Sequence, residues 1–418
     1  MKVTCVAIVI LLVSTSPLFG VSVSGSLTTM NWLRQEPIER NGEDLYNYLY
    51  EYIRVSIGDI ADDSLSAYIY TRVRKDIASD GKPDWRTIYG YLNWTGPQGY
   101  SIKVGRQFLP NGLGFWQMDG IRVKFKSFRG ISHSAYAGSS VAPWSVGENR
   151  DGLAGLSVDL PEILKLQTGL SLFANFDSKS FERVVIGGHL DSYDYSLFEL
   201  RKFIMYSKIN YDIINRELVQ GSATVNLNLL EKFGIYSEYY HGKQLFPEES
   251  IFSVFATDDI NEAAVGLRYN VFKSMLLAGR YSRYFSSSFP SSTFEIGLYR
   301  NRSRVTDFSI TMLKAEKPDT DSMDTGIRAS LGRSITKKFS AKISVYYNDY
   351  RLRGAEKRDN IHSLQLDLGY HIIDQISAHI RLEDNVDHNG DNSFRLLARV
   401  RLGFKYGQPS TGGEYGHR

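Results

Sequence analysis

The sequence predicts an all-β fold: a transmembrane antiparallel up-and-down β-barrel of about 22 strands, with about 18 or 20 as alternatives. Three observations carry this prediction. Apolar and polar residues alternate with a period of two along most of the chain after residue 20, short and long connections follow one another in turn, and the alternating segments are roughly 9–13 residues long, enough to cross a bilayer at a tilt. No later segment is apolar enough for a transmembrane helix, so a membrane-spanning chain would need a closed barrel.

The alternation is clearest at the C-terminal end of the chain. Every even position from residue 396 to 406 is apolar or aromatic, and the odd positions between them are mostly charged or small, including Arg399, Arg401 and Lys405. Successive strand residues point to opposite faces, so this segment has one apolar and one polar face. The same pattern recurs upstream, for example where Leu364 and Leu366 alternate with Gln365.

The connections separate a barrel from a soluble sandwich, which also shows alternation. Short turns are predicted near residues 161–162, 231–232, 273, 300–303, 337–338 and 374–375, and longer polar loops at 242–261, 316–324, 351–360 and 387–392. Tight turns at one rim and longer loops at the other are typical of transmembrane barrels. From residue 231 to residue 406 the turns divide the chain into five strand pairs, and about twelve further strands are expected before them. The period is least regular at residues 192–215.

The N-terminus has the pattern of a secretory signal peptide. Met1 and Lys2 precede an apolar run over residues 3–13 and then small residues, which predicts a leader over residues 1–22. The alternative is a membrane anchor, for which the run is short. The barrel is expected over residues 23–406 and a flexible tail over 407–418. The only cysteine, Cys5, lies in the leader, so no disulfide is expected.

Composition and motifs argue against several functions. The net charge of +3 is small and evenly spread, so no nucleic-acid partner is expected. We find no phosphate loop, zinc spacing or dinucleotide fingerprint, and expect no cofactor and no metal site. Residues 385–391 resemble the start of a calcium loop, but Leu396 stands where a bidentate glutamate is needed, so an Asn389-Gly390 turn fits better. The 27 tyrosines and 22 phenylalanines suit strands and interface girdles.

The leader, the alternation and a last strand ending in Phe404, Lys405 and Tyr406 resemble outer-membrane porins as a broad class. The segments 102–107 and 119–123, with Asn111-Gly112 between them, look like a strand–loop–strand element of porin-like proteins. The resemblance implies a Gram-negative outer-membrane location, with lipid, small solutes and the barrel-assembly machinery as partners. The chain departs from the class in continuing for twelve residues after Tyr406.

The polar face supplies the candidate pore-lining residues. The alternation places more cations than anions on this face, which favours a wet lumen with a mild preference for anions. The alternative for each residue is a cross-strand ion pair that stiffens the wall. The pore-lining candidates are Arg122, Lys124, Arg268, Arg280, Arg328, Lys342, Arg381 and Arg399.

A barrel of this size needs something to narrow it, and no N-terminal plug domain fits before the strands begin. Phe115 and Trp116 in residues 110–117, and Trp144 in residues 139–149, are candidates for loops that fold inward. The alternative is that these aromatic residues lie at the rim.

The sequence therefore predicts an outer-membrane channel for passive diffusion of small solutes, with no enzymatic activity. The alternatives are a non-conducting barrel that is structural, binds at the surface or supports export, a lipid hydrolase, and a secreted soluble β-protein. A hydrolase would need an activated serine, and neither His133 with Ser134 nor His189 with Ser192 has suitable spacing.

Overall fold

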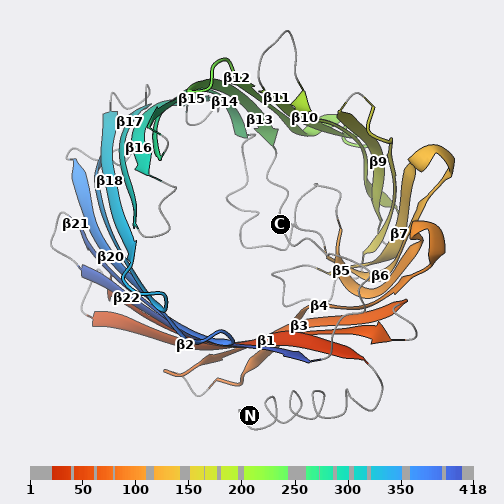
Figure 1. Ribbon diagram of the computed structural model, residues 1–418, viewed down its shortest axis with the longest axis horizontal. Helices are drawn as coiled ribbons and strands as arrows, with labels where there is room; N and C mark the ends of the chain where they lie inside the picture. Colours follow the sequence, from red (N-terminus) through yellow and green to blue (C-terminus); the bar gives the residue numbers. More distant parts are fainter. Residues whose placement is uncertain are drawn as a thin grey trace.

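The computed structural model is one closed antiparallel barrel of 22 strands (Figure 1). This confirms the predicted fold class and the predicted strand number. The structure describes residues 21–38, 42–60, 64–78, 81–109, 117–141, 151–163, 165–176, 180–195, 202–242, 260–272, 274–285, 290–300, 306–317, 322–350, 358–387 and 392–406. Residues 1–20 of the predicted leader, and the whole predicted tail (407–418), lie outside this part of the chain.

The strands follow one another around the wall in chain order. The first eleven are β1 (Ser22–Ile38), β2 (Gly42–Ile60), β3 (Leu65–Asp76), β4 (Asp84–Thr95), β5 (Ser101–Phe108), β6 (Gln117–Lys126), β7 (Ser132–Val141), β8 (Gly152–Asp159), β9 (Leu166–Phe176), β10 (Phe181–Tyr195) and β11 (Lys202–Asp212). The others are β12 (Glu217–Asn228), β13 (Phe233–Gly242), β14 (Ile260–Phe272), β15 (Met275–Tyr284), β16 (Ser291–Arg300), β17 (Thr306–Lys317), β18 (Ser322–Ser334), β19 (Phe339–Tyr350), β20 (Asp359–Ile373), β21 (Ile376–Asp387) and β22 (Asn392–Tyr406).

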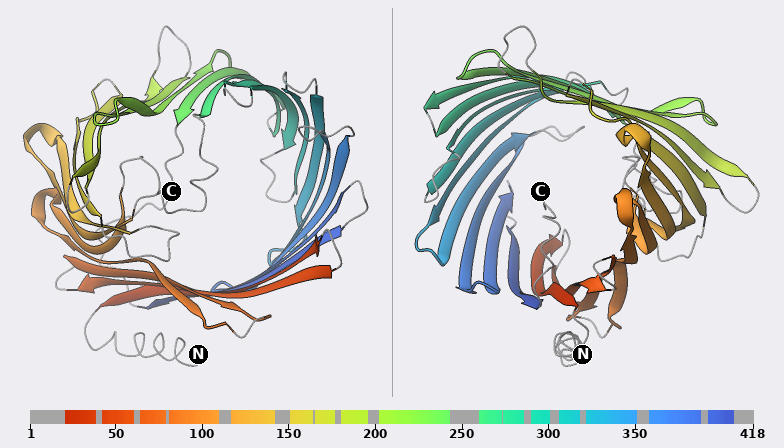
Figure 2. Two further views of the ribbon diagram at one scale, coloured as in Figure 1. Left: turned by 180° about the vertical axis from the view of Figure 1, so that it is seen from behind. Right: turned by 45° about the vertical axis from the view of Figure 1, so that its right-hand side comes forward.

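The barrel closes because the last strand pairs with the first. β22 runs antiparallel to β1, with Leu402 opposite Leu27 and Arg401 opposite Thr28. Every other pair joins strands that are neighbours in sequence, so each of the 22 described strands has a partner on both sides. Figure 2 shows the same wall of tilted strands from behind and in a view turned by 45°.

The two rims differ as the turn pattern predicted. At the rim that holds the start of β1 and the end of β22, two residues join β14 to β15 (273–274) and β20 to β21 (374–375). At the other rim, residues 243–259 join β13 to β14. Residues 192–215, where the period is irregular, depart from this rule. Six residues (196–201) join β10 to β11 at the rim of short turns, whereas only four (213–216) join β11 to β12 at the rim of long loops.

The outer face of the wall is mostly apolar, although Arg106 and Asp119 form an ion pair at outward positions of β5 and β6. Continuous cross-strand rows bring together residues such as Val104 with Ile121, and Leu27 with Leu402. Many of these side chains are exposed, including Leu170 (68%) and Val400 (50%), which is the arrangement a lipid-facing wall requires. Among the described residues, no helix is long and apolar enough to cross a membrane.

A row of glycines crosses the inner face where the wall passes from β5 to β7. Gly105 lies opposite Gly120, and Gly120 opposite Gly138. A Cβ on Gly120 would lie 2.2 Å from the carbonyl oxygen of Ala137 and 2.6 Å from the Cα of Gly138. Gly105 also has φ +122°, which L side chains rarely adopt. The backbones approach too closely here for any side chain, as at the corners of other barrels.

Candidate functional site: the inner wall

The strand register places all eight predicted cations on the inner face. For example, Arg280 lies between Gly266 and Glu295, whereas its neighbour Tyr281 lies in the apolar outer row with Val265 and Phe294. The same parity holds around the wall for Arg122, Lys124, Arg268, Arg328, Lys342, Arg381 and Arg399. Passage of solutes close to these side chains remains a prediction.

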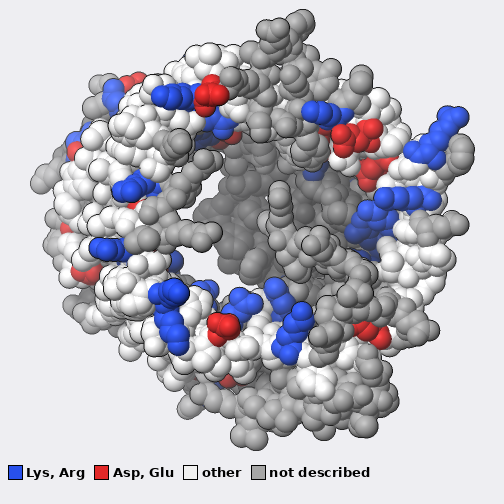
Figure 3. Space-filling view, viewed as in Figure 1, with Lys and Arg blue, Asp and Glu red and all other residues white. Residues whose placement is uncertain are grey.

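Cations are concentrated on one part of the inner face, from β22 through β1 to β6. We call this set the basic arc. In Figure 3, Lys and Arg gather along the lower edge of the opening, where Figure 1 places β22, β1 and β3. Among the described side chains, the only inward carboxylates of these strands are Asp76 and Asp84. The basic arc comprises Arg34, Arg54, Arg72, Arg74, Arg86, Lys103, Arg122, Lys124, Lys126, Arg395, Arg399, Arg401 and Lys405.

Some cations of the basic arc are paired. Arg72 lies 3.1 Å from Asp84 and Arg395 lies 3.2 Å from Glu383 of β21. Arg399 and Arg401, in contrast, are exposed and form no ion pair within the described part of the chain. The arc therefore combines wall-stiffening pairs with cations that face water.

The opposite part of the wall has a balanced charge. The guanidinium of Arg280 lies 2.7 Å from Glu262 and 3.2 Å from Glu238, with Glu295 opposite it on β16. Arg268 donates a hydrogen bond of 3.0 Å to Asn228 Oδ1. The contacts of Arg280 therefore match the alternative of a cross-strand ion pair better than they match an unpaired pore-lining cation.

The remaining candidates have mixed surroundings. Arg381 Nε lies 2.6 Å from Asp367, and Lys342 lies opposite Asp367 in the register. Arg328 lies over the ring of Tyr346, 5.3 Å from its centroid. Arg122 Nε donates to Ser134 Oγ at 3.1 Å. The contacts of Arg381, Arg328 and Arg122 hold these charged groups against the wall.

One sector of the inner face is packed as a core. Met118, Leu153, Phe173 and Val185 lie on β6, β8, β9 and β10, and none is more than 1% exposed. Their register positions are inward, next to Gly138, Asn175 and Asp212. This sector of the lumenal wall is therefore lined by apolar side chains that are shielded from water.

A second inner-face feature escaped the sequence reasoning. Aromatic side chains of β1 to β4 lie in contact with one another on the lumenal side of the wall. We call this set the tyrosine track. It comprises Trp32, Tyr46, Tyr48, Tyr50, Tyr52, Tyr68, Tyr70, Tyr89 and Tyr91. The signal in the sequence is the run of tyrosines at alternate positions of residues 46–52, which share one strand face.

The histidine–serine pairs considered for hydrolysis do not form. His133 and Ser134 point to opposite faces, and His133 Nε2 lies 3.0 Å from Ser127 Oγ instead. Ser134 accepts a hydrogen bond from Arg122. His189 is inward, 3.8 Å from Asp159, whereas Ser192 has the opposite parity. In the described residues, no group of three or more metal-ligating side chains gathers.

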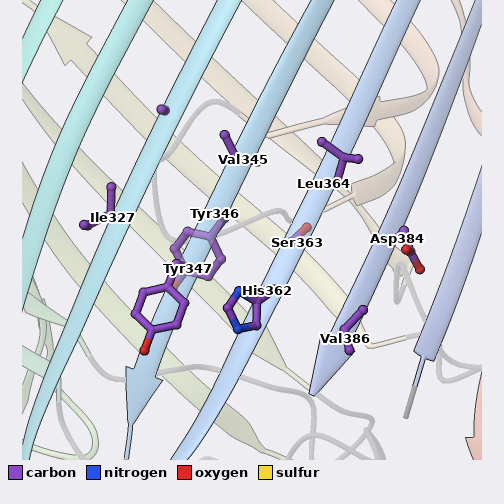
Figure 4. A pocket seen from close by; sticks show the side chains of 10 residues that line it. Ile327, Val345, Tyr346, Tyr347, His362, Ser363, Leu364, Asp384 and Val386 are labelled. Carbon is purple, nitrogen blue, oxygen red and sulfur yellow. The ribbon is translucent and has the colours of Figure 1, made fainter. Parts of the chain in front are cut away.

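The outer wall has shallow apolar grooves. One of about 300 Å³ lies across β18 to β21, and Figure 4 shows Tyr347 and His362 side by side in it, with ring centroids 4.9 Å apart. Ile327, Val345 and Leu364 complete an apolar lining on the lipid-facing side. This groove therefore belongs to the membrane contact and not to the lumen.

The predicted constriction residues Phe115, Trp116 and Trp144 lie outside the described residues. Their position in the pore stays a prediction. The incomplete calcium loop, residues 385–391, is described only as far as Asp387, the end of β21.

No protein-family model matches the chain, and no curated protein matches it. Solved structures do. They include OpdQ of Pseudomonas aeruginosa (7% identity, TM-score 0.46, 92% of this chain and 98% of that one) and OccAB4 of Acinetobacter baumannii (8%, 0.49, 92% and 98%). The translocation pore of the P pilus usher PapC matches with 7% identity and a TM-score of 0.50, over 94% of this chain and 100% of that one.

These likenesses concern the fold alone. The closed wall, the apolar outer face and the unequal rims give the chain the architecture of a Gram-negative outer-membrane β-barrel of porin-like form.

Proposed function

We propose that the barrel is a channel through which small solutes diffuse passively across the outer membrane, with a mild preference for anions. The observation that carries this proposal is the basic arc, in which inward Lys and Arg far outnumber Asp76 and Asp84. Rings and stripes of cations in a pore attract anionic permeants. The balanced charge around Arg280 on the other side makes the preference mild.

Single-channel recording of the refolded mature protein in a planar lipid bilayer tests the proposal. Discrete current steps are expected, with a reversal potential in a salt gradient that indicates anion selectivity. Heat-modifiable migration on a gel shows independently that the barrel is folded. Folded protein without current steps would overturn the channel, and cation selectivity would overturn the role of the basic arc.

A non-conducting barrel is the second candidate. The observation that favours it is the packed inner-face cluster of Met118, Leu153, Phe173 and Val185, which shows that part of the lumenal wall is closed to water. A surface-binding or export-scaffold role would follow if folded protein in the bilayer carried no current.

A further inference from the structure

The tyrosine track is a continuous aromatic surface. Trp32 lies on β1, four tyrosines on β2, and two each on β3 and β4, and every ring has a neighbour with a centroid distance between 5.1 Å (Tyr68 to Tyr91) and 6.4 Å (Tyr46 to Tyr48). The contacts cross the strand boundaries from Tyr52 to Tyr70 at 6.1 Å and from Tyr70 to Tyr89 at 5.3 Å.

The track lies in the lumen and keeps contact with water. Tyr46 is 37% exposed, and the other eight aromatic side chains are half-buried. The lipid-facing positions of the same strands are taken by other residues, such as Ile53 and Ile69. Interface girdles therefore do not account for these tyrosines, because a girdle residue faces outward.

Cations of the basic arc border the track. The guanidinium of Arg54 lies 4.8 Å from the ring centroid of Tyr70, that of Arg74 lies 5.7 Å from Tyr48, and the Lys103 ammonium lies 4.9 Å from Tyr91. Cation–π attraction at such distances holds the charged groups beside the rings. Arg54 and Lys103 form no ion pair among the described residues, so they keep the capacity to bind a carboxylate.

The track is long in one direction. Tyr46, Tyr48, Tyr50 and Tyr52 occupy alternate positions of β2, and the six residue steps from Tyr46 to Tyr52 cover about 20 Å. A single small ring would occupy only a fraction of this length. A linear chain of linked rings could contact several tyrosines at once, and the combined contacts would give a higher affinity than any single ring has.

We propose that the tyrosine track is a binding path for linear acidic oligosaccharides, chains of sugar rings that carry carboxylates. This inference rests on the proposed channel function and names its substrate class. The apolar faces of the sugar rings lie against the tyrosine rings, the phenol hydroxyls and guanidinium groups bond to sugar hydroxyls, and Arg54 and Lys103 bind carboxylates.

The test uses current block in the planar bilayer with tetragalacturonate as the probe. We expect concentration-dependent block that is at least tenfold weaker with monomeric galacturonate and with neutral maltotetraose. Replacement of three track residues, Tyr50→Ala, Tyr52→Ala and Tyr70→Ala together, should raise the half-blocking concentration at least tenfold. The matched Tyr→Phe replacements keep the rings and should change it by less than threefold.

Three outward tyrosines provide the control. Tyr239→Ala, Tyr269→Ala and Tyr281→Ala together remove the same atoms from the lipid-facing side and should leave block unchanged. If the triple track variant does not fold, Tyr70→Ala alone is used, with at least a twofold effect expected.

Each outcome is decisive. Three results would overturn the binding path while leaving the channel intact. They are normal current steps that tetragalacturonate does not block, equal block of the wild type and the Ala variant, and stronger block by benzoate, a single aromatic ring with one carboxylate, than by tetragalacturonate. Absence of current steps from folded protein would overturn the channel. In that case, tryptophan fluorescence tests binding at the track directly. A change on adding tetragalacturonate that is lost in Trp32→Phe would support binding there, and the absence of any change would overturn it.

Discussion

Replacing Arg399 and Arg401 by glutamine tests whether the basic arc sets the charge preference. Both side chains are exposed on the inner face of β22, opposite His379 and Ser377 of β21, and neither forms an ion pair within the described residues. Glutamine keeps a polar side chain of similar length, so the strand register should be unaffected. The expected result is a lower ratio of anion to cation permeability.

The size of the effect follows from Coulomb's law. A unit charge about 10 Å from an ion path through water contributes about 0.4 kcal/mol, which screening in 0.1 M salt lowers to about 0.15 kcal/mol. Two charges act on anions and cations with opposite sign, so the ratio changes by about 0.6 kcal/mol, or roughly threefold. In 0.01 M salt, where the Debye length is about 30 Å, the change grows to about 1.2 kcal/mol, or roughly eightfold.

The assay is the reversal potential of single channels in salt gradients centred on these two concentrations. Arg283→Gln with Arg300→Gln is the control, because it removes the same charge from outward positions of β15 and β16. An unchanged ratio, an equal change in the control, or an effect that does not grow at low salt would each refute the reasoning.

Three further variants test the wall itself. Gly120→Val should reduce the refolded fraction on a heat-modifiability gel at least severalfold, because its Cβ would lie 2.2 Å from a carbonyl oxygen, whereas Gly279→Val, with its nearest neighbour at 3.9 Å, should refold normally. Asp212→Ala should lower the free energy of unfolding in urea by about 3 kcal/mol. The reason is that this fully buried carboxylate accepts hydrogen bonds from the β11–β12 turn and pairs with Arg183. A loss below about 1 kcal/mol would contradict this. Arg280→Gln should destabilise by about 1 kcal/mol, and adding Glu262→Gln should restore part of it; additive losses in urea unfolding would argue against the pair.

Much of the fold could be predicted because a transmembrane barrel repeats one rule. The outward face must be apolar at every second residue, so strands such as β22 and β20 can be recognised without knowledge of their partners. The rule fails at residues 192–215, where the connections do not follow the short and long alternation. There the strands are defined by cross-strand pairing, which no local pattern records.

The inner wall was only partly predictable, since its contacts join residues far apart in the chain. The parity of Arg280 could be read from the sequence, but its pairing with Glu238, 42 residues away, depends on the register of three strands. The tyrosine track was missed for a different reason. Tyrosine suits both an apolar and a wet face, so Tyr48 and Tyr50 did not distinguish the inner side of β2 from the outer side.

The unequal strand lengths have a consequence for the surrounding lipid. β5 and β8 have 8 residues each, whereas β1 and β2 have 17 and 19. Eight residues tilted by about 45° rise only about 19 Å, less than the apolar band of about 25 Å that such barrels usually present. Lipid beside β5 and β8 must thin locally if the polar ends of these strands are to stay out of the acyl layer, whereas lipid beside β1 and β2 need not. The short strands β5 and β8 therefore favour a locally thinner bilayer on this side of the barrel.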